Sequence, residues 1–225
     1  MNAMMHIGLF GGTFNPIHLG HLRAALEVKE GFDLDQIFLI PAAIPPHKFQ
    51  GDVVNAQDRM EMINLAVPAG GELAASDVEL KRSGTSYTID TVNHFKQTLP
   101  EKTRIYLIMG LDAFLEIDTW KSYDQLLEQI PLIVITRPNS ISGHPDADRQ
   151  TLDNELKTRI SKSYIFSDSK SCYEQDGKQP IHFFKVTALD ISSSKIRELV
   201  RKGKSINYLV PQKIAEFIEK KGLYV

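Results

Sequence analysis

Two histidines, His18 and His21, lie three residues apart near the start of the chain, at the end of the stretch GGTFNPIHLGH. This stretch begins at Gly11 and follows a short apolar run, residues 7–10. Residues three apart on a helix differ by roughly 60° around its axis, so both imidazoles can reach one spot at a first helical turn. Imidazoles donate hydrogen bonds to phosphate oxygens and, when protonated, bring positive charge close to a reacting phosphoryl group. The spacing therefore predicts phosphate contact.

The loop before the histidines is also suited to binding an anion. Gly11 and Gly12 allow unusual backbone angles and let a ligand approach the main chain. A glycine-bearing turn from a strand into a helix leaves free N–H groups and a helix dipole that favour phosphate. The loop is neither a Walker loop nor a Gly-x-Gly-x-x-Gly dinucleotide fingerprint. Two alternatives stay open below phosphate contact: histidines that only cap the helix, and zinc binding, for which no third ligand lies close by.

Composition limits the classes of partner. The 225-residue chain has a formal net charge of −2, so any cationic site must be local rather than a property of the whole surface. Cys172 is the only cysteine, which excludes an intramolecular disulfide and fits a reducing compartment. The apolar runs are too short to span a bilayer, and the first residues lack a signal-peptide pattern. We expect a cytoplasmic protein without a nucleic-acid or membrane partner, and leave a homo-oligomer open.

Short apolar runs alternate with segments of helical spacing along the chain. The runs are continuous, as is typical of strands covered on both faces of a parallel sheet. They comprise residues 7–10, 37–40, 105–109, 132–135 and 181–186. The alternation predicts an α/β fold, a doubly wound, Rossmann-like parallel sheet with helices on both faces. In such sheets ligands bind at the carboxyl ends of the strands, near the point where strand order reverses.

Capping signals mark several of the predicted helices. Asn55 with Asp58 resembles a capping box, Ser192 and Thr88 can cap helices that follow them, and Pro211 suits a first turn. We expect one domain over residues 1–225, interrupted by a polar insertion at about residues 139–180. Within the insertion we expect a short helix near residues 152–160 and a weak strand near residues 164–166. A surface elaboration, a lid and an oligomer contact are all open roles for it.

The stretch GGTFNPIHLGH resembles the signature of the nucleotidylyltransferase superfamily, whose histidine motif also appears in class I aminoacyl-tRNA synthetases. The superfamily's other diagnostic element is a serine- or threonine-rich helix start late in the chain. This sequence has ISSSKIRELV at residues 191–200. The resemblance implies that this helix start holds the β- and γ-phosphates of ATP, through Ile191, Ser192, Ser193 and Arg197.

Further motifs stand at predicted strand ends and helix starts: IPPHK, GTSYTIDT, MGLDAF, IDTWKSY and VITRPN. Together they resemble the bacterial nicotinate-mononucleotide adenylyltransferases, from Met5 to about Gly222. The resemblance implies further ATP-binding residues: Gly11, Gly12, Thr13, Phe14, His18, His21, Gly110, Asp112 and Arg137. It also implies residues that bind the mononucleotide: His47, Lys48, Thr85, Tyr87, Thr88 and Trp120.

The implied reaction is attack of the mononucleotide 5′-phosphate on the α-phosphorus of ATP, giving nicotinate adenine dinucleotide and pyrophosphate in NAD biosynthesis. No protein nucleophile is needed, so catalysis reduces to alignment and charge stabilisation. The catalytic residues would be His18, His21, Ser193 and Arg197. Mg²⁺ would accompany the ATP phosphates, with no protein residue as its ligand.

Two other functions stay open at this point. The first is another adenylyl- or cytidylyltransferase of the superfamily, for example one acting on phosphopantetheine; GTSYTIDT and Trp120 count against it. The second is a nucleotide-sensing protein that binds without turnover. The choice of the nicotinate acid over the amide depends on N–H donors at the helix start near Thr85 and Thr88, which would favour a carboxylate.

Overall fold

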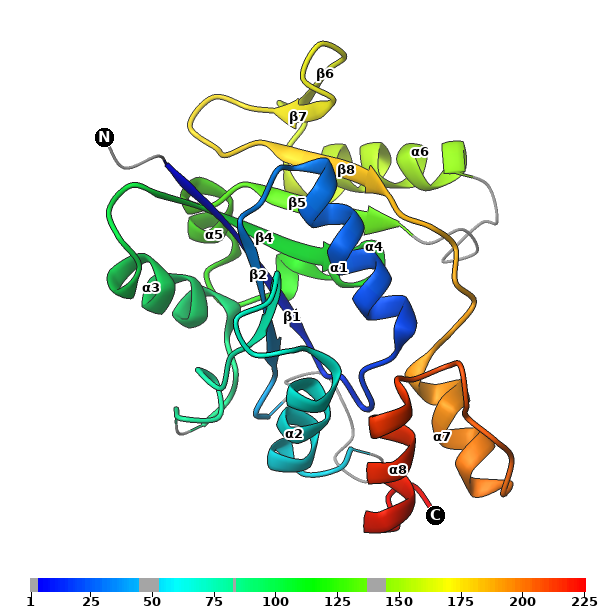
Figure 1. The fold of residues 1–225 in the computed structure, drawn as a ribbon. Coiled ribbons are helices and arrows are strands. Elements are labelled where there is room, and N and C mark those ends of the chain that lie inside the picture. Colours follow the sequence, from blue (N-terminus) through cyan, green and yellow to red (C-terminus); the bar gives the residue numbers. More distant parts are fainter. Residues whose placement is uncertain (1–3, 45–52, 83, 137–144) are drawn as a thin grey trace. The chain divides into compact units, whose positions relative to one another are not determined.

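A computed structural model describes residues 4–44, 53–82, 84–136 and 145–225 of the chain (Figure 1). The chain forms two compact units. Unit 1 comprises Met1–Leu9 and Tyr87–Ala188, and unit 2 comprises Phe10–Ser86 and Leu189–Val225. None of the helices in the described residues has the length and apolar character required to cross a membrane.

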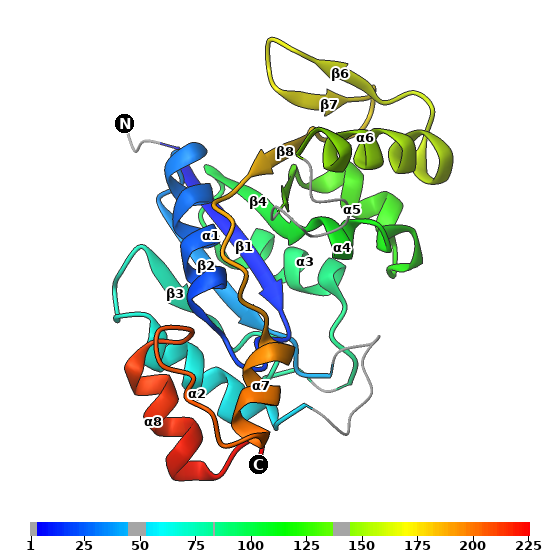
Figure 2. The ribbon, with the colours of Figure 1, turned by 90° about the vertical axis from the view of Figure 1, so that its right-hand side faces the viewer.

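In its described residues, unit 2 combines two parallel strands with four helices. Its elements are β2 (Gln36–Pro41), β3 (Leu73–Ala75), α1 (Leu19–Gly31), α2 (Ala56–Ala66), α7 (Ser193–Arg201) and α8 (Gln212–Lys221). Strand β1 (Met5–Gly12) starts in unit 1 and ends in unit 2, where the strand order is β3-β2-β1. Ile37 pairs with Leu73 in parallel register. Helix α2 packs against both strands and against α8, beside which it lies in Figures 1 and 2.

Local capping signals account for the starts of two of these helices. The Asn55 side chain accepts a hydrogen bond from the backbone N–H of Asp58 at 2.8 Å, as the capping-box pattern predicts. The Ser192 hydroxyl accepts from the N–H of Lys195 at 3.2 Å and caps α7. Pro211 takes the N-cap position of α8, one residue before the predicted first turn.

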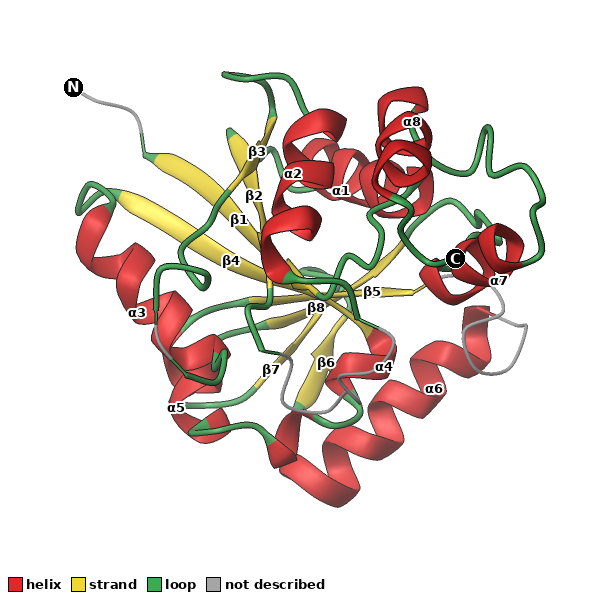
Figure 3. Cartoon of the chain, turned by 90° about the horizontal axis from the view of Figure 1, so that it is seen from below, coloured by secondary structure: helices red, strands yellow, loops and turns green. Residues whose placement is uncertain are grey.

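Unit 1 contains parallel strands that continue into an antiparallel edge. Its elements are β4 (Thr103–Gly110), β5 (Leu132–Thr136), β8 (Ile181–Lys185), β6 (Ile165–Ser167), β7 (Cys172–Glu174), α3 (Thr88–Thr98), α4 (Leu111–Phe114), α5 (Tyr123–Gln129), α6 (Pro145–Glu155) and two short helical turns, η2 (Ile117–Thr119) and η3 (Leu156–Ile160). The strand order is β1-β4-β5-β8-β7-β6. Every residue of β5 is buried, and the strand is apolar up to its last residue, Thr136, as expected for a strand covered on both faces. Helices α3 and α5 lie side by side in Figure 3.

Parallel strands joined by helices confirm the predicted doubly wound, Rossmann-like fold class. The five predicted strands are all present, each within two residues of its predicted ends. The sequence prediction missed β3 and β7, which have three residues each and depend on pairing with a neighbour. The predicted weak strand corresponds to β6, and β6 and β7 together extend the edge at β8. The predicted helix of the insertion begins earlier, at Pro145.

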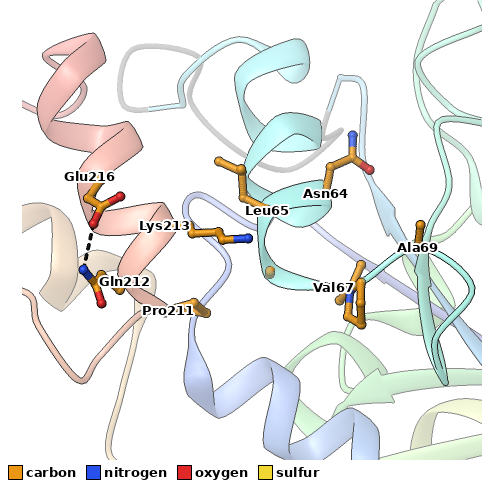
Figure 4. A pocket seen from close by; sticks show the side chains of 10 residues that line it. Asn64, Leu65, Val67, Ala69, Pro211, Gln212, Lys213 and Glu216 are labelled. Carbon is orange, nitrogen blue, oxygen red and sulfur yellow. Dashed lines mark hydrogen bonds between the residues drawn. The ribbon is translucent and has the colours of Figure 1, made fainter.

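A surface pocket lies between the carboxyl end of α2 and the amino end of α8 in unit 2 (Figure 4). Its wall includes Leu65, Val67 and Lys213, and the Gln212 side chain donates a hydrogen bond to Glu216 at 2.8 Å on its rim. The predicted site residues that the structure describes do not line this pocket.

Candidate active site

The two histidines of the loop stack on each other in unit 2. His18 is the N-cap residue of α1 and has an extended backbone, while His21 is on the first turn. Their ring centroids are 3.7 Å apart with an interplanar angle of 23°. The His18 side chain is buried, whereas His21 is partly exposed. The two imidazoles therefore converge on one place at the start of a helix, which is the geometry that their spacing predicts.

Small residues make room for the histidine rings. A Cβ on Gly20 would lie 3.1 Å from the Nδ1 of His18 and 3.7 Å from the carbonyl oxygen of Ile191. A Cβ on Gly12 would lie 2.9 Å from the Phe14 ring, which packs edge-on against His21 at 5.1 Å. Glycine at both positions thus permits the close packing of the loop.

The serine-rich start of α7 lies against the same loop. The Ser193 hydroxyl donates to the carbonyl oxygen of Pro16 at 2.9 Å, and the Arg197 guanidinium donates from Nη1 to the carbonyl oxygen of Asn15 at 2.9 Å. A second Arg197 nitrogen, Nη2, lies 3.3 Å from the Ser194 hydroxyl. The histidine loop and the helix start therefore form one cluster, as a shared phosphate site requires. Figure 2 shows α7 beside the carboxyl end of β1.

This geometry changes the expected contribution of Ser193. Its hydroxyl hydrogen is directed to Pro16, so in this arrangement the hydroxyl offers lone pairs rather than a proton. The free N–H groups at the start of α7 are the donors that an anion would meet there. Ser192 similarly uses its hydroxyl oxygen as the cap of α7.

Three residues that hold this loop were missed by sequence reasoning. Arg59 on α2 is fully buried, and its guanidinium donates to the carbonyl oxygens of Thr13 at 2.8 Å, Val54 at 3.1 Å and Ala43 at 3.2 Å. Burial lowers the pKa of Arg59 from its ordinary value. An arginine next to the apolar face of a predicted helix was the available signal, because buried arginines need several hydrogen-bond partners.

Asn15 and Tyr224 are the other two. The Asn15 side-chain oxygen accepts from the N–H of Val54 at 3.2 Å and from the hydroxyl of Tyr224 at 2.9 Å. Asn15 is buried, and Tyr224 follows α8, 209 positions later in the chain. Their pairing carries no local sequence signal.

Hydrogen bonds connect the start of IPPHK with GTSYTIDT, the two motifs predicted to bind the mononucleotide. The N–H of Ala43, just before the IPPHK stretch, donates to the Ser86 hydroxyl at 2.8 Å, and the N–H of Ser86 donates to the Ile44 carbonyl at 3.4 Å. Thr85 is exposed next to this connection. His47 and Lys48 lie outside the described residues.

The remaining predicted residues belong to unit 1. Gly110 ends β4 and Asp112 is in the first turn of α4; a Cβ on Gly110 would collide with the Asp112 carboxylate. Trp120, partly exposed, follows η2. Arg137 lies outside the described residues.

The helix start at GTSYTIDT differs from prediction in one respect. Tyr87, not Thr88, is the N-cap residue of α3, and no side chain caps this helix. The predicted cap at Thr88 is therefore wrong, because Thr88 already has helical geometry. In place of a side-chain cap, the carbonyl oxygen of Tyr87 accepts hydrogen bonds from the N–H groups of Asp90 at 3.1 Å and Thr91 at 3.3 Å. The Lys121 ammonium lies 4.5 Å from the centroid of the Tyr87 ring.

The sequence is similar to a known protein family and to several named proteins. Residues 9–199 match the model of the cytidylyltransferase-like family. A Desulfatibacillum aliphaticivorans protein named probable nicotinate-nucleotide adenylyltransferase is 39% identical over 223 residues, which cover 98% of this chain and all of the relative. A Pseudomonas syringae pv. tomato protein of the same name is 40% identical over 218 residues, or 97% of this chain and 93% of the relative.

Solved structures show the same fold. The Plasmodium falciparum nicotinic acid mononucleotide adenylyltransferase, complexed with NaAD, superposes with a TM-score of 0.71 at 17% sequence identity. The superposition covers 98% of this chain and 97% of the other.

Proposed function

We infer the chemistry of this protein from the premise that the chain belongs to the cytidylyltransferase-like family. Two relatives that are 39% and 40% identical over nearly the full length are named probable nicotinate-nucleotide adenylyltransferase. The chain accordingly transfers the adenylyl group of ATP to nicotinate mononucleotide, with release of pyrophosphate, in NAD biosynthesis. The observation in the structure that carries this function is the junction of the histidine loop with α7, where Arg197 contacts Asn15 at 2.9 Å.

The reaction needs no covalent intermediate with the protein. A 5′-phosphate oxygen of the mononucleotide attacks the α-phosphorus of ATP, a new P–O bond forms, and the bond to the bridging oxygen of the leaving pyrophosphate breaks. The protein's work is to align the reacting groups and to stabilise negative charge on the transferring phosphorus and the leaving group.

We assign the catalytic contacts to the loop and the helix of unit 2. His18 and His21 would donate to phosphate oxygens from their stacked imidazoles. The backbone N–H groups at Ser193 and the guanidinium of Arg197 would hold the β- and γ-phosphates. Support for this assignment comes from the cluster that Pro16, Asn15 and α7 form.

The other substrate contacts are proposals of the same kind. We assign ATP to residues at the glycine-rich end of β1, at the start of α7 and in the MGLDAF and VITRPN motifs. These residues are Gly11, Gly12, Thr13, Phe14, Ile191, Ser192, Gly110, Asp112 and Arg137. We assign nicotinate mononucleotide to His47, Lys48, Thr85, Tyr87, Thr88 and Trp120. The uncapped start of α3 supports a carboxylate there, because its N–H groups favour negative charge.

A divalent metal is generally expected for an ATP-using enzyme of this family. We propose that this metal is Mg²⁺ and that it enters as part of the MgATP substrate. In the part of the chain that the structure describes, no group of three His, Cys, Asp or Glu side chains could hold a metal. The proposal is based on the general behaviour of Mg²⁺, which often binds through substrate phosphate oxygens rather than through a cage of protein ligands. We also propose a cytoplasmic location for the reaction.

Steady-state kinetics with two acceptors test the proposed function. The purified protein is given MgATP with either nicotinate mononucleotide or nicotinamide mononucleotide, and pyrophosphate release is followed. We expect turnover with both ATP and acceptor present and a higher kcat/KM for the acid, because N–H donors favour a carboxylate over an amide. Preference for the amide would overturn the acceptor assignment. Binding of both substrates without pyrophosphate would instead identify a nucleotide sensor.

A further inference from the structure

Consecutive parts of the histidine loop are held by side chains from distant segments of unit 2. Arg59 donates to the carbonyl oxygen of Thr13, Arg197 to that of Asn15, and Ser193 to that of Pro16. Each of these bonds fixes the main chain. The Asn15 side chain is held separately, by Val54 and Tyr224.

Asn15 takes part in two kinds of contact, one through its side chain and one through its main chain. Its side-chain oxygen accepts two hydrogen bonds, and its main-chain oxygen accepts the bond from Arg197, to which we assigned phosphate binding. Only 4% of Asn15 is exposed. A change in the orientation of its buried amide would therefore shift the carbonyl that orients the Arg197 guanidinium.

Tyr224 reaches Asn15 by an unusual backbone route. Helix α8 ends at Lys221; its C-cap residue, Gly222, has a left-handed φ of 59°, and Tyr224 has a φ of 67°. A left-handed conformation is unfavourable for a residue with a bulky side chain. Here it turns the ring inward and brings the hydroxyl to 2.9 Å from the Asn15 side chain.

The surroundings of the Tyr224 hydroxyl keep it as a donor. Burial raises the pKa of Tyr224, while the positive charges of Arg197 and Arg59 partly oppose this and Asp58 adds to it. The hydroxyl thus keeps its proton under ordinary assay conditions. Both arginines that hold the histidine loop lie close enough to act on it.

We propose that Tyr224 is a positioning residue for adenylyl transfer: its hydroxyl fixes the Asn15 side chain, and Asn15 fixes the Arg197 guanidinium beside the histidine loop. Tyr224 itself is not assigned to any substrate contact. The inference rests on the function proposed above, because the effect is expected at the phosphate contacts of Arg197.

The test is Tyr224→Phe, which removes only the hydroxyl. Because a misplacement of about 1 Å can cost on the order of 10²-fold, we expect kcat to fall by roughly 10-fold, with the KM for ATP changed by less than about threefold. Hydrogen exchange should become faster in peptides that cover residues 13–19. The matched control is Tyr208→Phe, because Tyr208 also has a left-handed backbone (φ 64°) but is 91% exposed.

A double-mutant cycle shows whether Tyr224 acts through Asn15. In an Asn15→Ala background, Tyr224→Phe should cause no further loss of kcat, since the partner of the hydroxyl is already absent. Assays are run well below the unfolding midpoint of each variant. A purely structural role would lower that midpoint and leave the kcat of the folded enzyme unchanged, which would overturn the inference.

Two further outcomes separate the inference from the proposed function. If Tyr224→Phe has wild-type kcat, or loses as much activity in the Asn15→Ala background as alone, the positioning role is wrong and the function stands. If the wild-type protein releases no pyrophosphate from ATP and nicotinate mononucleotide, the function is wrong. In that case the hydrogen-exchange rate of residues 13–19 tests the positioning role. An exchange rate in Tyr224→Phe equal to that of the wild-type protein would overturn it.

Discussion

Gly20 is the residue on which the packing of His18 most directly depends. It lies inside α1, where glycine costs about 1 kcal/mol relative to alanine. The chain bears this cost at a place where a methyl group would sit 3.1 Å from the imidazole. Alanine at position 20 would stabilise the helix but crowd the His18 ring. Glycine makes the helix less stable and leaves the ring its space.

Gly20→Ala should separate these two effects. We expect kcat to fall by roughly 10-fold or more, because the added methyl displaces the His18 ring, while stability falls far less than activity, because alanine favours the helix. The measurements are steady-state kinetics and the thermal unfolding midpoint. Gly31→Ala, at the exposed end of the same helix, is the control and should keep wild-type kcat. Wild-type kcat in Gly20→Ala would show that the ring position does not matter.

Helix starts have different functions in different parts of the chain. Helix α2 has a closed start, in which Asn55 and Asp58 bond to each other through two hydrogen bonds. Helix α3 has no side-chain cap, and α7 has one cap, Ser192, while Ser193 bonds to the histidine loop. The hydrogen bonds thus distinguish the closed start of α2 from the starts of α3 and α7, to which we assign ligands.

Asn55→Ala tests the stabilising cap. Loss of the bond to the N–H of Asp58 should lower the free energy of unfolding by about 1 kcal/mol. Chemical denaturation with a fixed slope measures the change. Gln57→Ala alters an exposed side chain on the same first turn and should change stability much less. Equal effects of the two substitutions would mean that the cap contributes nothing.

At the scale of the whole molecule, charge is arranged locally. A chain with a net charge of −2 must attract phosphates by placing cations and N–H groups at one site. We propose that Arg197 and the start of α7, which lie together in unit 2, supply these groups. The remaining charge neutralisation is assigned to the metal that ATP brings with it.

Metal removal should therefore affect turnover and not the fold. If the metal is Mg²⁺ bound through ATP oxygens, as we propose, excess EDTA should stop pyrophosphate release and added Mg²⁺ should restore it. The unfolding midpoint of the ligand-free protein should stay the same with and without EDTA. A midpoint lowered by EDTA would indicate a resident metal and contradict the proposal.

The sequence by itself determined the features that depend on neighbouring residues. His18 directly precedes α1 and His21 lies on its first turn, so their short spacing brings the two rings together. The apolar run of residues 132–135 likewise indicates a strand covered on both faces. The caps at Asn55 and Ser192 are likewise local, since each bond spans three residues. Such contacts are encoded by spacing, so they can be read before the fold is known.

Only the tertiary structure decided which distant groups complete the cluster. Ser193 reaches Pro16 across 177 positions, Arg197 reaches Asn15 across 182, and Tyr224 reaches Asn15 across 209. No periodicity records such pairings, because they arise when packed elements bring separate segments together. For the same reason the short strands β3 and β7 escaped prediction: three residues carry little local preference, and pairing with a neighbouring strand makes them strands.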